Sequence, residues 1–432
     1  MIKYLAVLSF ALTACASAPA ASDSPSTPAA QVPGAPEITT PMTPVSASEP
    51  ANPQLSQEQR FSAWKTGFID RALTKNYDPA LVKRVMAPAQ INPSAIQSDK
   101  EQPEFTKPIW SYVENAASAG RLSTGREKLS EHEKLFNEIE QRYSVDRSVL
   151  TAIWGLESAF GKIQGNHNMI DSLSTLAFEG RRREWAEQNL FAVLDMLARG
   201  DVRLDQLTGS WAGAMGMTQF IPTTFRDYAI DFDNNGNKDL WGNEGDALGS
   251  AAHYLSRHGW RIEEPIIAEV RLPRGFDYGL ADGTKRTVSG WTGMGVSPIS
   301  GQNWSKQAMF LEAKLLVPAG AKGPTFLTFK NFDVIKKYNN STSYALGITV
   351  LAEGMQNRRA IQSSWPKLDR PLSRTDKENM QRALTRQGYN TKGVDGQIGP
   401  NTRRAIRAWQ KANGLPADGY VEQTLLQKIL AG

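Results

Sequence analysis

A stretch of helical periodicity that ends in a carboxylate constrains this chain more than any other feature. Leu150, Ile153 and Trp154 recur at the spacing of one helix face, which predicts a helix packed against a core. Asp146 is the expected N-cap of that helix. Glu157 follows Ile153 by four positions and Trp154 by three, so it continues the apolar face. The pattern therefore predicts a carboxylate at a position that faces a core.

A carboxylate at such a position has two interpretations. Burial disfavours the charged form and raises a carboxyl pKa, which suits a general acid that works near neutral pH. A glutamate at a helix end, salt-bridged to a nearby arginine, fits the segment equally well. The segment alone leaves both interpretations open.

The N-terminus has the pattern of an export signal. A basic start precedes an apolar run over 4–14, and the run ends in Leu12-Thr13-Ala14-Cys15, which resembles a bacterial lipobox. This pattern predicts a lipoprotein signal peptide over 1–14, with cleavage before Cys15 and lipidation of its sulfur. Ala16 in the next position implies the outer membrane, with the protein facing the periplasm. A plain secretory signal cut near Ala18 or Ala20 is the alternative.

Length and composition divide the rest of the chain. At 432 residues the chain predicts two or more domains. Residues 15–55 are rich in Ala, Ser and Pro and predict a flexible tether. Residues 56–365 are mainly helical in pattern, with a small strand-and-turn insertion around 266–328. Residues 371–432 form a separate small unit.

Charge and cysteine content limit the partners. The net charge of +5 is modest and dispersed, so we expect no nucleic-acid partner, whereas a wall polymer rich in carboxylates fits. Cys15 is the only cysteine, so no intramolecular disulfide can form. We expect a monomer.

The C-terminal unit carries a set of turn and helix motifs. Two Asp-Gly pairs, Asp395-Gly396 and Asp418-Gly419, have similar surroundings and form a weak internal repeat. The remaining motifs are Met380 to Leu384, Gly388-Tyr389, Val394 to Thr402, Ala405 to Gln410 and Gly414 to Gly419. Together they resemble the peptidoglycan-binding domain of the three-helix type. The resemblance implies wall binding, although most of these residues are structural.

A second informative stretch runs from Gly209 to Pro222. Small residues alternate with large ones there, which suits close approach of the backbone to a ligand. Ser210 and Gln219 supply hydrogen-bonding groups of the kind that recognise sugar hydroxyls and acetamides. Tight helix packing in a core is the alternative explanation.

The order of several motifs resembles that of the family B lytic murein transglycosylases. The motifs are Glu157 to Gly161, Ser172 to Phe178, Arg181-Arg182, Ser210 to Pro222 and Tyr338 to Tyr344. The resemblance implies an α+β, mainly helical, lysozyme-like catalytic domain with Glu157 as its single catalytic acid/base. It also implies that the glycan groove is lined by Ser210, Gln219, Asn339 and Tyr344, with Arg181, Arg182, Tyr254 and Tyr338 as weaker assignments.

One carboxylate is sufficient for the chemistry that this resemblance implies. Most glycosidases use two carboxylates. A lytic transglycosylase cleaves between N-acetylmuramic acid and N-acetylglucosamine while the muramyl 6-hydroxyl attacks its own C1, so no cofactor is expected. A hydrolytic muramidase on the same fold, and a peptidoglycan-binding lipoprotein without activity, are the alternatives.

Residues 231–239 match the start of an EF-hand calcium loop. Oxygen-bearing side chains occupy positions 1, 3, 5 and 9, and Gly236 occupies position 6, but position 12 is Gly242 instead of glutamate. The family resemblance implies a loop closed by a later aspartate, Asp246. The candidate ligands of a structural Ca²⁺ are Asp231, Asp233, Asn235, Asn237, Asp239 and Asp246. An Asn-Gly turn without metal is the alternative.

Overall fold

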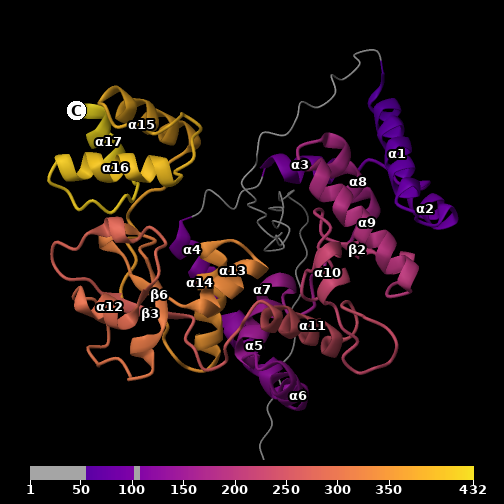
Figure 1. Ribbon diagram of the computed structural model, residues 1–432, viewed down its shortest axis with the longest axis horizontal. Helices are drawn as coiled ribbons and strands as arrows, with labels where there is room; N and C mark the ends of the chain where they lie inside the picture. The colour runs from indigo at the N-terminus through magenta and orange to yellow at the C-terminus, as the bar shows by residue number, and fades with distance from the viewer. Residues whose placement is uncertain (1–54, 102–107) are drawn as a thin grey trace, which may run out of the picture. The chain divides into compact units, whose positions relative to one another are not determined.

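The computed structural model describes residues 55–101 and 108–432, which are mainly helical (Figure 1). The predicted signal peptide, Cys15 and the tether up to residue 54 lie outside the described residues. Within them no helix is both long enough and apolar enough to cross a bilayer.

The helices before the insertion, with the exception of α3 (Pro93–Glu101), share one hydrophobic core. In chain order they are α1 Gln57–Thr74, α2 Pro79–Met86, α3 Pro93–Glu101, α4 Ile109–Ala116, α5 Ala119–Glu131, α6 Glu133–Tyr143, α7 Arg147–Ser158, α8 Met169–Glu179, α9 Arg183–Arg199, α10 Pro222–Tyr228 and α11 Glu244–Arg257. Helices α13 Lys330–Tyr338 and α14 Thr342–Met355 return to the same core after the insertion. The predicted mainly helical lysozyme-like fold is confirmed.

Helix α7 lies at the centre of this core. Every residue from Ser148 to Ser158 is buried, and α5, α6, α11 and α14 pack around the helix. Asp146 occupies the N-cap position, as predicted, but its side chain makes no capping bond. Its Oδ2 instead accepts a hydrogen bond from Trp260 Nε1 at 3.1 Å, so packing against a distant indole replaces the predicted local cap.

A short two-stranded ribbon introduces the 209–222 loop. Strand β1 His167–Asn168 pairs antiparallel with β2 Thr208–Gly209, with His167 opposite Gly209. Gly165 lies beside this pair, and a Cβ on it would come within 2.2 Å of the Gly209 carbonyl oxygen. Glycine is therefore required where the two segments cross.

The predicted strand-and-turn insertion is a five-stranded antiparallel sheet in the order β4-β6-β7-β3-β5. Its strands are β3 Ile267–Arg271, β4 Arg286–Thr287, β5 Ser297–Pro298, β6 Glu312–Leu316 and β7 Phe326–Thr328, and helix α12 Val288–Gly293 belongs to the same unit. Trp291, Leu315 and Leu327 contribute to a separate small core. In Figure 1 this unit is the orange segment that carries the labels α12, β3 and β6.

The C-terminal unit consists of helices α15 Arg374–Arg386, α16 Pro400–Ala412 and α17 Gln423–Ala431 around their own core. The internal repeat has a structural cause. Buried Gln381 accepts hydrogen bonds from the backbone N–H groups of Asp395 and Gly396, at 3.1 and 2.9 Å. Gln410 repeats this bond with Gly419 N at 2.8 Å. Each Asp-Gly turn is thus held by a glutamine from a preceding helix.

Candidate active site

Glu157 lies one residue before the end of α7 and is 2% exposed. Burial of a carboxylate is costly unless hydrogen bonds compensate it. The hydroxyl of Tyr344, on α14, donates to Glu157 Oε1 at 2.6 Å. The burial of Glu157 and this hydrogen bond favour the interpretation of its carboxyl as a general acid.

The chain turns sharply directly after Glu157. Ala159, Phe160 and Gly161 have consecutive left-handed backbone angles, with φ of 49°, 60° and 83°. Ser158 stabilises this turn because its Oγ donates to Met217 O at 2.6 Å and accepts from Gly161 N at 2.9 Å. The end of α7 is therefore bonded directly to the 209–222 loop.

Tyr344 is held as a hydrogen-bond donor. Burial, followed by the nearby charge of Glu157, raises the pKa of Tyr344 well above its ordinary value. The hydroxyl therefore keeps its proton throughout the neutral range. The backbone N–H of Tyr344 is in turn held by the N-cap side chain of Ser341 at 3.2 Å, which fixes the start of α14.

Tyr338 and Tyr254 have different roles from Tyr344. The Tyr338 hydroxyl donates to the carbonyl of Thr218, and burial together with the charge of Glu157 raises its pKa. Tyr254 is 8% exposed, packs edge-on against Tyr338 at 5.3 Å between ring centroids, and donates to Lys337 O at 2.6 Å. Tyr338 is thus close enough to Glu157 for that carboxylate to affect its pKa, whereas Tyr254 contacts the ring of Tyr338.

The principal charges acting on Tyr338 and Tyr344 are those of Glu157 and of neighbouring tyrosines. No second carboxylate is among them. Glu179 and Glu184, which follow Glu157 along the chain, are both exposed. The geometry therefore presents one carboxylate with a neutral phenol beside it.

The 209–222 loop is a tight structure built around small residues. Ser210 Oγ accepts from Ala214 N at 3.0 Å, and Met215 exchanges backbone hydrogen bonds with Phe220 at 2.8 and 3.1 Å. Gly216 has φ of 66°, and a Cβ on it would lie 2.4 Å from the Leu240 carbonyl oxygen. The alternation of small and large residues therefore reflects close backbone packing as well as any ligand.

Two of the predicted groove residues have polar atoms without a partner. Gln219 has a left-handed φ of 50°, and its Nε2 donates to Gln164 O at 3.1 Å and Gly216 O at 2.9 Å. Its Oε1 is buried and has no hydrogen-bond partner among the described residues, and Asn339 Oδ1 is in the same condition. Buried acceptors of this kind are costly, so they indicate a ligand or water that completes them.

Arg181 and Arg182 share a single carboxylate on α3. Asp99 Oδ1 lies 2.5 Å from Arg181 Nη2 and 3.0 Å from Arg182 Nε. The Arg182 guanidinium also lies 6.0 Å from the ring centre of Trp211, beside Ser210. Arg182 is therefore at the edge of the 209–222 loop. The single negative charge of Asp99 offsets one of the two positive charges of Arg181 and Arg182.

Three of the six predicted metal ligands come together. Carboxylate oxygens of Asp231, Asp233 and Asp246 all lie within 4.8 Å of one another. Burial raises the pKa of Asp246, which disfavours its ionised form. A cation bound beside it would offset this effect. Oxygen donors at this spacing suit Ca²⁺.

The other three predicted ligands remain predictions, and Asn235 is bonded to the cluster, because its Nδ2 donates to Asp233 Oδ2 at 3.0 Å. Asp239 Oδ1 accepts from the N–H groups of Trp241 and Gly242, both at 2.9 Å, and is not part of the carboxylate cluster. Asn235 Oδ1 accepts from Asn237 N at 2.9 Å, and the Asn237 side chain is exposed. Local turn formation in the loop therefore uses these side chains.

Sequence reasoning did not identify Tyr112, on α4. The proximity of its hydroxyl group contributes to the raised pKa of Tyr344, and its ring packs where a Cβ on Gly347 would meet it at 3.1 Å. The only signal in the sequence is a glycine inside an otherwise apolar helical segment, which indicates close approach of a large neighbour.

Family models match two parts of the chain. The model of the transglycosylase SLT domain matches residues 60–353, and the model of a putative peptidoglycan binding domain matches residues 373–429.

The chain is similar to proteins of known structure or function. Membrane-bound lytic murein transglycosylase B of Escherichia coli K12 is 29% identical over 306 residues, which cover 67% of this chain and 81% of that relative. The structure of SltB3 from Pseudomonas aeruginosa, in complex with NAG-anhNAM-pentapeptide, superposes with a TM-score of 0.82 at 45% identity and covers 86% of this chain and 99% of SltB3. The Escherichia coli lytic transglycosylase Slt35 in complex with calcium gives 0.59 at 27% identity, covering 68% and 92%.

Proposed function

This chain belongs to the transglycosylase SLT family as a lytic transglycosylase that acts on peptidoglycan, and we propose that Glu157 is its single general acid/base. One observation carries this assignment. Glu157 is almost fully buried and accepts a hydrogen bond at 2.6 Å from a phenol that keeps its proton.

The proposed reaction uses Glu157 twice. Protonated Glu157 gives its proton to the glycosidic oxygen as the bond from muramyl C1 breaks. The Tyr344 hydroxyl stabilises the carboxylate that forms, since a hydrogen bond to a charged acceptor is stronger than one to a neutral acceptor. Ionised Glu157 then takes the proton of the muramyl 6-hydroxyl while that oxygen bonds to C1. The products are a new 4-hydroxyl and a 1,6-anhydromuramyl end.

The nucleophile belongs to the substrate, which favours ring closure over hydrolysis. An intramolecular hydroxyl has a high effective concentration at C1. The protein's contribution is to keep water away from Glu157, which its burial accomplishes.

The glycan is held by groups around Glu157. We assign Gln219 Oε1 and Asn339 Oδ1 as acceptors for sugar N–H or O–H groups, because both are buried and have no hydrogen-bond partner in the described part of the chain. Ser210 lies in the 209–222 loop together with Gln219. Tyr338 offers only its ring to the glycan, because its hydroxyl donates to the carbonyl of Thr218. Tyr254 supports Tyr338, and Arg181 and Arg182 lie at the margin.

We propose that Asp231, Asp233 and Asp246 would hold a structural Ca²⁺, which would take no part in the chemistry. The similarity to a relative whose structure contains calcium supports this proposal.

The proposed location is the periplasmic face of the outer membrane, through a lipid on Cys15. The membrane-bound relative supports membrane association. A Cys15→Ala variant should lose incorporation of radiolabelled palmitate and appear in the soluble fraction. Unchanged membrane fractionation would rule out the anchor.

The test of the catalytic assignment compares wild type with Glu157→Gln on purified sacculi. Wild type should release muropeptides with 1,6-anhydro ends, seen by mass spectrometry as one water lighter than reducing ends. Glu157→Gln keeps the size of the side chain and removes the acid, so it should release almost none. Wild-type products with reducing ends would identify a muramidase, and undiminished cleavage by Glu157→Gln would remove Glu157 from its role.

The C-terminal unit is proposed to hold the enzyme on the wall without taking part in chemistry, and the enzyme is proposed to act as a monomer. Two linked binders of one polymer gain residence through effective concentration. Deletion of residues 372–432 should weaken sacculus binding and leave turnover of short soluble fragments nearly intact. Equal loss of both would contradict this division.

A further inference from the structure

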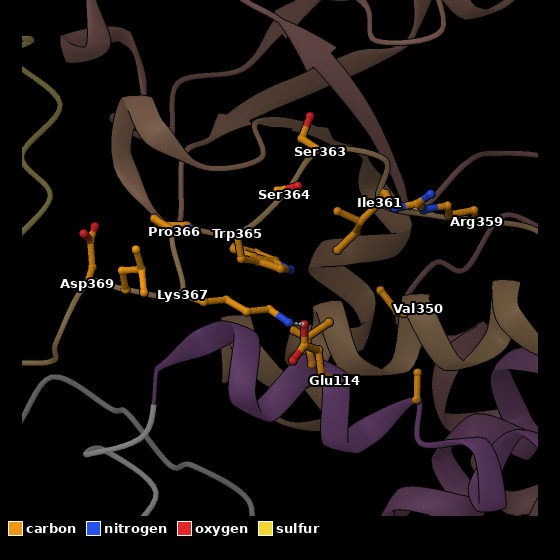
Figure 2. Close-up of a pocket in the computed structure, with 13 residues that line it drawn as sticks. Glu114, Val350, Arg359, Ile361, Ser363, Ser364, Trp365, Pro366, Lys367 and Asp369 are labelled. Atoms are coloured by element: carbon orange, nitrogen blue, oxygen red, sulfur yellow. Dashed lines mark hydrogen bonds and ion pairs between the residues drawn. The ribbon is translucent and has the colours of Figure 1, made fainter.

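A cavity of about 780 Å³ lies between helices α4 and α14 and the segment 359–369. We call it the Trp365 cavity, after the indole at its centre in Figure 2. None of the residues assigned above to the Glu157 site lines it. Its lining residues are Val113, Glu114, Ala117, Val350, Arg359, Ile361, Ser363, Ser364, Trp365, Pro366, Lys367, Leu368 and Asp369.

Polar contacts fix the walls of the cavity. Glu269, on β3, is 6% exposed and accepts hydrogen bonds from Gln362 N at 2.5 Å and Ser363 N at 3.0 Å. On the opposite side Lys367 Nζ lies 2.6 Å from Glu114 Oε1 on α4, the contact dashed in Figure 2. A segment without helix or strand is thus held at both ends. The cavity is therefore preformed, and its size is within the range of small-ligand sites.

Not every charged side chain in the cavity has an oppositely charged partner within the part of the chain that the structure describes. Glu114 pairs with Lys367, and Asp369 pairs with Lys322 at 3.3 Å. Arg359 has no carboxylate partner among the described residues. Its Nε donates to Ile361 O at 2.8 Å and its Nη2 to Gln362 O. The N–H groups of its Nη1 have no partner in residues 55–101 and 108–432, and charged donors of this kind are suited to a carboxylate.

The remaining surface is mostly apolar. Val113, Val350 and Ile361 form aliphatic walls around the half-buried indole of Trp365, and the hydroxyls of Ser363 and Ser364 add polar groups. An occupant that matches this surface has small aliphatic groups and at least one free carboxylate.

We propose that the Trp365 cavity is an accessory binding site for the stem peptide of peptidoglycan, with Arg359 receiving a peptide carboxylate. The proposal rests on peptidoglycan being the substrate. A stem peptide carries alanine methyl groups and free carboxylates, whereas a peptide-free N-acetylglucosamine oligomer has no carboxylate for Arg359. Binding at this site would select strands that retain their peptides.

The test measures peptide binding without cleavage. Full-length protein with Glu157→Gln is titrated with the free tetrapeptide L-Ala-γ-D-Glu-meso-diaminopimelate-D-Ala in a calorimeter. Arg359→Gln in the same background should raise Kd about tenfold or more, as expected for one charge-assisted hydrogen bond. Arg358→Gln is the matched control, since the neighbouring Arg358 pairs with Glu353 and does not line the cavity. Its Kd should equal that of the background protein.

A second variant and a second ligand complete the test. Trp365→Phe keeps an aromatic ring in the wall and should weaken the tetrapeptide less than Arg359→Gln does. An N-acetylglucosamine tetramer should bind Arg359→Gln and Arg358→Gln alike. Equal tetrapeptide affinity in the two arginine variants, or saccharide binding that depends on Arg359, would overturn the proposal. Failure of the catalytic function is distinguishable, because it would appear as absence of anhydro products from wild type and leaves this titration unaffected.

Discussion

Replacing Tyr344 with phenylalanine tests the most specific contact at the site. The substitution keeps the buried ring and removes the hydroxyl 2.6 Å from Glu157 Oε1. A hydrogen bond to a charged group contributes about 1.5–3 kcal/mol. Because each 1.36 kcal/mol is tenfold in rate, the loss corresponds to about a 10- to 150-fold decrease in kcat. The carboxylate becomes charged only as its proton leaves, so KM should change little.

The assay is release of anhydro-muropeptides from sacculi, quantified by chromatography with mass detection. Tyr338→Phe is the matched comparison, because it removes a buried hydroxyl that donates to the Thr218 carbonyl instead of to the carboxylate. Its loss of kcat should be clearly smaller. The raised pKa of Tyr344 also means that wild type keeps this donor up to about pH 10. A kcat within twofold of wild type for Tyr344→Phe, or equal losses in both variants, would refute the assigned role.

Three further predictions follow from the structure. Chelation of Ca²⁺ should lower Tm in calorimetry, and Asp246→Asn should abolish that effect, because Asp246 is the fully buried member of the carboxylate cluster; a Tm unaffected by chelator would exclude the metal. Gln381→Ala should accelerate amide exchange at Asp395 and Gly396 and destabilise the C-terminal unit by about 1–3 kcal/mol, since it leaves buried N–H groups unpaired; unchanged exchange would contradict this. Gly216→Ala should greatly reduce soluble yield or activity, because its Cβ would lie 2.4 Å from the Leu240 carbonyl oxygen; a fully active, stable variant would contradict the close packing.

The catalytic helix could be predicted from the sequence because its periodicity is local. A stripe of apolar residues identified α7, and its continuation at Glu157 predicted the burial that the structure confirms. Asp146 occupies the predicted N-cap position, but its side chain makes no capping hydrogen bond. Asp146 bonds to Trp260, which lies 114 positions away, and no local pattern reports such a contact.

Contacts between distant segments account for most of what the sequence did not reveal. Tyr112 and Tyr344 come from helices far apart in the chain, and only the packing of α4 against α14 brings them together. In the calcium loop the ligand spacing predicted six donors, and it gave no sign that Asp239 and Asn235 also accept hydrogen bonds from backbone N–H groups. Spacing identifies residue types that can bind a metal and does not determine where each side chain turns.

The Asp-Gly repeat is an instructive intermediate case. The repeated dipeptide was visible in the sequence, whereas its cause, a buried glutamine on a preceding helix, appears only in three dimensions. The repeat therefore reflects how the turns are held and does not by itself identify a ligand site.

Digestion of sacculi in ¹⁸O-labelled water tests the central claim most directly. If Glu157 takes the proton of the muramyl 6-hydroxyl while that oxygen closes the ring, the released muropeptides should carry anhydro ends without ¹⁸O. Reducing ends labelled with ¹⁸O at C1 would show that water is the nucleophile and would contradict the account.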